Sequence, residues 1–323
     1  MLRLLSTSNC VKMHNKISRR RAAKLFGAMA AGAILPIGAS RLFAAGESSQ
    51  RIMRAIPSTH EKLPVIGLGS ALTFDVRGSR QLQPIGEVLA LFVKHGGKLI
   101  DTSPAYGNAE SVIGDLAYKE HLTSSLFFAT KVWTRDKQEG ISQMQRSLER
   151  FRTRSIDLEQ VHNLADVDRQ MTSLREWKAK GQIRYTGITY SEDRGHGEVE
   201  TVMRAQKPDF VQINYSLMDR AAAQRILPLA QEMGMGVIIN RPFGGGGIFQ
   251  VISAKPLPPW TAEFDCHSWA QFLLKWIVSH PAVTCVIPAT NDPKHLEDNM
   301  GAGVGRLPDA KTRARMASLF VGF

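Results

Sequence analysis

The sequence predicts a single closed (β/α)8 barrel, a TIM barrel, over most of its 323 residues. From Leu63 onward, eight short apolar or β-branched runs alternate with amphipathic stretches, which is typical of βα units with parallel strands. No GxGxxG segment follows the first run, so a closed barrel is favoured over an open dinucleotide-binding sheet. The length agrees, because such barrels take about 250 residues as one domain.

Each predicted element is justified by its own run of residues. The strand segments are short and rich in Val, Ile and Phe, and the helical segments carry apolar residues at helical spacing. Several helical segments end in Lys or His followed by Gly, a combination that suits a helix C-terminus. The predicted strands are 65–69, 98–101, 126–132, 157–163, 183–189, 209–214, 236–240 and 284–288. The predicted helices include 84–96, 109–120, 141–151, 168–181 and 269–280.

Composition and charge separate the chain into a basic leader and a nearly balanced body. Hydrophobic residues make up 43% and charged residues 22%, which is ordinary for a folded protein and excludes wholesale disorder. The net charge is +12, but residues 1–45 hold eight Lys and Arg and no acidic residue, which leaves 33 basic against 29 acidic residues in the body. The basic excess therefore indicates a targeting segment, and no nucleic-acid partner is expected.

Residues 1–45 are predicted to be an export signal peptide, and residues 46–323 the barrel domain. The basic segment SRRRAAK (18–24) precedes an apolar run (25–39), and small residues allow cleavage near residues 44–46. The arginine pair and the weakly apolar run are typical of twin-arginine signals, which use the twin-arginine export machinery. A periplasmic or exported location is therefore expected. An uncleaved anchor is the alternative, but Pro36 interrupts a run that is already short for a membrane span.

Cysteines and possible metal ligands are sparse in the body. Only Cys266 and Cys285 follow the leader, without CxxC spacing, so two buried structural thiols are expected. Neither HxH nor a paired carboxylate cluster stands at the strand ends, and no metal site is predicted. This argues against a barrel lyase or a metal-dependent sugar isomerase.

Three ionisable side chains lie at the ends of the second to fourth predicted strands, and a fourth lies in the loop after the second strand. In such barrels the reactive groups project from the carboxyl ends of the strands, so Asp101, Tyr106, Lys131 and His162 are expected to converge. Each alone has a simpler explanation, respectively a helix cap, a loop aromatic, a surface cation or a satisfied core histidine. Together they form a plausible acid–base set, because an ammonium group stabilises a phenolate and needs a carboxylate as its counter-charge.

The segments around these residues resemble the aldo-keto reductase family. LIDTSPAYGNAESVIG (99–114), FATKVW (128–133) and QVHN (160–163) carry the resemblance, which extends from about Leu63 to Asn299. It implies reversible reduction of an aldehyde or ketone to an alcohol, with hydride from C4 of NADPH and with NADH as the alternative cofactor. Tyr106 would be the proton donor, tuned by Lys131 and Asp101, and His162 would orient the substrate. It also implies a small-molecule carbonyl or alcohol substrate, a monomer, and pocket residues Trp133 and Asn163.

The resemblance also implies where the cofactor binds. The implied contacts are Thr189, Tyr190, Gln212, Arg241, Phe243, Ile287, Thr290, Asn291, His295, Asp298 and Asn299. The sequence departs from the family pattern in three places. Asn240 stands where the family has an aromatic that stacks on the nicotinamide, with Arg241 as a possible substitute, and Ala289 and His295 replace frequent cations. The loss of cations weakens a strict preference for NADP, although Lys294 would compensate.

A nucleotide-binding barrel with a regulatory or structural role is the alternative function. The complete set of Asp101, Tyr106, Lys131 and His162 argues against it, because a pure binding protein needs no proton donor. The segments 73–83 and 244–263 are expected to shape the substrate pocket.

Overall fold

The computed structural model describes residues 50–320, and eight parallel strands form its main sheet in the order β10-β9-β8-β7-β6-β5-β4-β3. All eight predicted strands are present, so that prediction is confirmed. The predicted signal peptide and its cleavage site lie outside the described residues. The strands are β3 Leu68–Gly69, β4 Leu99–Asp101, β5 Phe127–Val132, β6 Ile156–His162, β7 Ile183–Thr189, β8 Phe210–Asn214, β9 Gly236–Asn240 and β10 Cys285–Val286.

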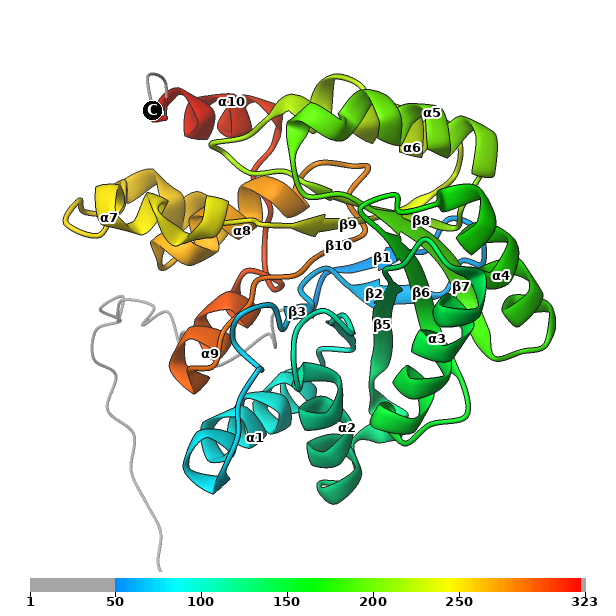
Figure 1. Ribbon diagram of the computed structural model, residues 1–323. Helices are drawn as coiled ribbons and strands as arrows, with labels where there is room; N and C mark the ends of the chain where they lie inside the picture. Colours follow the sequence, from blue (N-terminus) through cyan, green and yellow to red (C-terminus); the bar gives the residue numbers. More distant parts are fainter. Residues whose placement is uncertain (1–49, 321–323) are drawn as a thin grey trace, which may run out of the picture. The chain divides into compact units, whose positions relative to one another are not determined.

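The sheet closes into the predicted (β/α)8 barrel (Figure 1). Parallel bridges join Ile66 to Val286 and Gly69 to Ala289, and they connect the first strand to the last. The first strand can approach its neighbours closely because a Cβ at Gly69 would lie 2.8 Å from the Ile287 carbonyl oxygen. A larger residue there would push the closing strands apart.

Helices surround the strands (Figure 1). The five helices named from the sequence are all present, although the first begins at Ser79 and therefore contains Pro84 instead of starting at it. The helices are α1 Ser79–Lys94, α2 Ala109–Lys119, α3 Lys137–Phe151, α4 Val167–Ala179, α5 His196–Gln206, α6 Ile226–Glu232, α7 Ile248–Ile252, α8 Trp269–Val278, α9 Pro293–Gly301 and α10 Ala310–Ser318.

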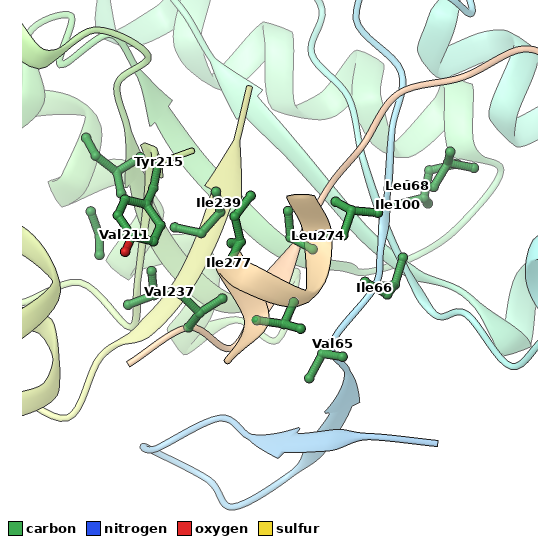
Figure 2. Packing of buried hydrophobic residues seen from close by; sticks show 14 of the residues in the cluster. Val65, Ile66, Leu68, Ile100, Val211, Tyr215, Val237, Ile239, Leu274 and Ile277 are labelled. Carbon is green, nitrogen blue, oxygen red and sulfur yellow. The ribbon is translucent and has the colours of Figure 1, made fainter. Parts of the chain in front are cut away.

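The strands separate two apolar layers. Alternate residues of each strand point to opposite faces, so Phe127 and Ala129 of β5 lie in the interior cluster, whereas Phe128 and Val132 pack in the outer one. Figure 2 shows part of the outer layer, where side chains of α8 lie among those of β9. Burial of both faces explains why the strands are nearly continuous apolar runs.

A hairpin that the sequence did not predict lies at the amino end of the barrel. Its strands, β1 Met53–Ala55 and β2 Lys62–Pro64, pair in antiparallel register. The hairpin contributes Ile56 and Leu63 to the interior cluster. It thereby covers the amino end and leaves the carboxyl end for a functional site.

The cysteines and the helix lengths of residues 50–320 bear on two further expectations from the sequence. Cys266 and Cys285 are buried and free, as predicted. Across residues 50–320, no helix combines the length and apolar character needed to cross a membrane.

Candidate active site

The four predicted catalytic residues come together at the carboxyl end of the barrel. Asp101 is the last residue of β4, Lys131 the penultimate residue of β5 and His162 the last residue of β6. Tyr106 lies in the loop between β4 and α2. Because parallel strands end at the same rim, these side chains reach one site from separate segments.

A buried ion pair forms the centre of the site. Lys131 Nζ donates to Asp101 Oδ2 and to the Thr102 carbonyl oxygen, both at 2.6 Å. The Lys131 and Asp101 side chains are only 1% and 4% exposed. Burial alone would lower the pKa of Lys131, but the charge of Asp101, together with the interaction with Tyr106, outweighs this effect and holds that pKa above its ordinary value. The ammonium group therefore keeps its positive charge, 5.1 Å from the centre of the Tyr106 ring.

A chain of side-chain amides fixes the other side of Asp101. Gln212 Nε2 donates to Asp101 Oδ1 at 2.7 Å, and Gln160 Nε2 donates to the same atom at 3.1 Å. Because a carboxylate only accepts hydrogen bonds, Gln212 must turn its Oε1 atom away, where it accepts from Thr189 Oγ1 at 3.1 Å and from Asn240 Nδ2 at 3.4 Å. The charge of Asp101 thus sets the orientation of the amides around it.

His162 is neutral and lies between aromatic neighbours. Burial, and secondly the charge of Lys131, lowers its pKa to about 3. Its ring centre is 6.0 Å from that of Tyr106 and 5.5 Å from that of Trp133, and Ser103 Oγ is 3.3 Å from Nδ1. A neutral imidazole can hydrogen-bond a carbonyl oxygen, but it does not act as an imidazolium acid at physiological pH.

The two predicted pocket residues differ in what they contact. Trp133 is 51% exposed and leans over His162, as a substrate-contacting aromatic would. Asn163 is exposed and left-handed (φ 50°), and its backbone amide donates to the Thr189 carbonyl oxygen. Trp133 therefore belongs to the mouth of the site, whereas the described contact of Asn163 is structural.

The predicted nicotinamide-end residues surround the amide chain at the ends of β7, β8 and β9. Asn240 Nδ2 also donates to the Tyr190 carbonyl oxygen at 3.1 Å, so this side chain turns inward and is not placed for stacking. Arg241 is exposed and donates to the Ser191 carbonyl oxygen at 3.2 Å. Phe243 stacks edge-on against Phe249, with ring centres 5.0 Å apart.

The residues predicted for the adenosine end lie after β10 and on α9. Ile287 belongs to the buried interior cluster, and Thr290 Oγ1 accepts the Asp292 amide at 3.0 Å in the cap of α9. Asp298 accepts from Gln271 at 2.8 Å. Three more residues complete the group: Asn291 and His295 are exposed, and Asn299 is buried.

Sequence reasoning missed Gln160 and Ser103 as site residues. Gln160 lies two positions before His162 on β6, and the two-residue repeat of a strand places both side chains on the interior face. That repeat was the signal for Gln160. Nothing in the sequence indicated that Ser103 would contact His162.

The described part of the chain contains no cluster of three or more potential metal ligands. The site instead combines a phenol, a buried ammonium–carboxylate pair and a neutral imidazole at the open end of a (β/α)8 barrel. Together these features fit an oxidoreductase, because a phenol held beside an ammonium group can exchange a proton with a carbonyl or alcohol oxygen.

Comparisons with known proteins identify the family. Residues 65–317 match the model of the aldo/keto reductase family, and the chain belongs to that family. It is 26% identical over 246 residues to methylglyoxal reductase YeaE of Escherichia coli, covering 73% of this chain and 84% of that protein. It is also 24% identical over 269 residues to the E. coli NADH-specific methylglyoxal reductase, covering 67% and 81%.

Solved structures support the fold. An aldo/keto reductase from Klebsiella pneumoniae, in complex with NADP and acetate, superposes with a TM-score of 0.69 at 22% identity, covering 81% of this chain and 93% of that one. The holo form of AKR11C1 from Bacillus halodurans also gives 0.69, at 20% identity, covering 84% and 96%. The family does not favour the alternative of a purely regulatory or structural barrel.

Proposed function

We propose that this protein is an NAD(P)H-dependent reductase that converts a small aldehyde or ketone to an alcohol, reversibly. The observation that carries the proposal is the buried Lys131–Asp101 pair beside Tyr106. An ammonium–carboxylate pair that is almost inaccessible to water contributes little net stability in most proteins, so chemistry is the better reason for its presence.

The rim residues fit a nicotinamide nucleotide. Asn240 Oδ1 is a buried acceptor with no partner among the described residues, and an amide N–H is the kind of donor that would satisfy it. Arg241 is exposed beside it, and Lys294 is exposed in the first turn of α9, so both offer positive charge for phosphates. When bound, the nicotinamide ring supplies the hydride.

The protein's own part is to deliver a proton and to orient the carbonyl. Tyr106 gives its phenolic proton to the substrate oxygen, and the Lys131 ammonium group stabilises the phenolate that remains. Asp101 holds Lys131 in place and keeps it charged. His162 hydrogen-bonds the same oxygen and fixes its direction, while Trp133 covers the neighbouring surface.

Fluorescence titration with NADPH and NADH, followed by an aldehyde panel that includes methylglyoxal, tests this function. Binding of at least one nucleotide and turnover of at least one carbonyl are expected. Tyr106→Phe should retain nucleotide affinity and lose at least about 100-fold in kcat, because only proton transfer is removed. Failure of the wild-type protein to bind either nucleotide would contradict the proposal.

We also propose that residues 1–45 direct twin-arginine export to the periplasm and that the nucleotide stays bound after export. In that compartment one substrate alcohol would be oxidised as another carbonyl is reduced, so the hydride is conserved and no external reductant is needed. Replacing Arg19, Arg20 and Arg21 with lysine should retain the protein in the cytoplasm, as measured by cell fractionation. Periplasmic protein purified without bound nucleotide would rule out retention.

A further inference from the structure

The hydroxyl group of Ser103 is buried and has two polar neighbours. The residue lies two positions after Asp101 and is 0% exposed. Its Oγ atom accepts the Ala105 backbone amide at 3.2 Å and lies 3.3 Å from His162 Nδ1. None of the roles described above uses this side chain.

The donors and acceptors around the Ser103 hydroxyl indicate which nitrogen of the His162 ring carries the hydrogen. The neutral ring of His162 carries one hydrogen, on either Nδ1 or Nε2. If Nδ1 carried it, Ser103 Oγ would accept from both Nδ1 and Ala105, and its own hydrogen would lack any described acceptor inside the protein. If Nε2 carries it, Ala105 donates to Oγ and Oγ donates to Nδ1, so the Ser103 hydroxyl and Nδ1 are both satisfied and the Nε2 hydrogen is left for a ligand.

We infer that Ser103 is a positioning residue that holds His162 in the tautomer with hydrogen on Nε2. Ser103 occupies Nδ1, so the N–H bond is at the far edge of the ring. The inference rests on the proposed function and deepens it. The substrate oxygen would accept one hydrogen bond from this N–H and another from the Tyr106 hydroxyl. The site then presents two hydrogen-bond donors to one oxygen and favours carbonyl substrates that can accept both.

Nitrogen-15 NMR of the nucleotide-free protein tests the inference directly. Long-range proton–nitrogen correlation of histidine-labelled protein at pH 7 should give the Nε2–H pattern for His162, assigned by its loss in His162→Gln. Ser103→Ala should give a mixture of both tautomers. Thr102→Val is a matched control, because it removes a neighbouring buried hydroxyl that has no described partner, and it should keep the wild-type pattern.

The outcomes separate this inference from the proposed function. An Nδ1–H pattern in the wild-type protein, or an unchanged pattern in Ser103→Ala, overturns the inference whatever the activity. If Ser103→Ala does not fold, the wild-type spectrum alone decides. Where the enzyme is active, Ser103→Ala should lower kcat roughly threefold to tenfold with a smaller change in KM, as expected for one misplaced hydrogen bond. If the wild-type protein shows the Nε2–H pattern but reduces no carbonyl, the proposed function is overturned and the inferred tautomer of His162 is supported.

Discussion

Removal of the Lys131 ammonium group should destabilise the protein far more than loss of an ordinary ion pair. In Lys131→Met the apolar part of the side chain is preserved, and Asp101 loses its 2.6 Å charged partner. The remaining donors to Asp101 are the neutral amides of Gln160 and Gln212, at 3.1 and 2.7 Å. An ionised carboxylate then stays buried without a counter-charge.

The expected cost is about 3–5 kcal/mol in the free energy of unfolding, the usual range when one partner of a buried pair is deleted. The double variant Asp101→Asn/Lys131→Met leaves no unpaired charge, so its free energy of unfolding should exceed that of Lys131→Met by at least about 2 kcal/mol. Lys137→Met is the control, because its 3.2 Å pair with Glu176 is exposed (47% and 45%) and should be worth less than about 1 kcal/mol.

Urea unfolding at pH 7, followed by circular dichroism, measures these differences if the slopes of the transitions agree between variants. Reductase activity should fall by at least about 100-fold in both variants that lack Lys131, because Tyr106 loses the charge that stabilises its phenolate. The reasoning is refuted if Lys131→Met costs no more than Lys137→Met, or if the double variant is no more stable than Lys131→Met.

Three further predictions concern buried titratable groups. Glu159 is fully buried with neither carboxylate oxygen partnered by a described residue, and burial, followed by the charge of Glu110, raises its pKa well above 4.5. Above pH 4.5 the unfolded state releases this proton while the folded state keeps it, so the group lowers the free energy of unfolding as pH rises. Glu159→Met should remove that pH dependence and raise the free energy of unfolding by about 1–3 kcal/mol at pH 7. Urea unfolding over a pH series would measure both effects. The His162 imidazole should remain neutral down to about pH 4 in NMR titration, and a midpoint near the ordinary 6.5 would contradict its placement. Because burial raises the pKa of Cys266 to about 11 and also raises that of Cys285, neither thiol should react with a disulfide reagent at pH 8 before the protein unfolds.

The elements that the sequence predicted correctly are those whose residues signal them locally. β5 and β9 are short apolar runs buried on both faces, and such runs differ clearly from the amphipathic helices between them. The hairpin of β1 and β2 has three-residue strands, too short for an alternating pattern to stand out. The predicted helix 84–96 starts at Pro84, whereas α1 begins at Ser79 and includes that proline in its second turn.

The four ionisable residues of the site could be predicted because a parallel barrel brings the carboxyl ends of its strands to one rim. The hydrogen bonds between them depend on strand register, which the sequence does not display. Register places Lys131 opposite Gln160, and Thr189 opposite Gln212, so the amides meet Asp101 only when the strands are aligned this way. A shift of one residue would turn these side chains to the other face.

At position 240, where the resemblance implies a stacking aromatic, Asn240 instead takes part in the amide chain that the register assembles. The Asp101 carboxylate turns the NH2 group of Gln212 toward itself, and the Oε1 atom that faces away needs donors. Asn240 at the end of β9 supplies one through Nδ2, which a phenyl ring, having no hydrogen-bond donor, could not do. Its remaining Oδ1 atom has no described partner, and that is the group a bound carboxamide would satisfy. A change at position 240 should therefore alter the amides around Asp101 as well as the binding of nucleotide.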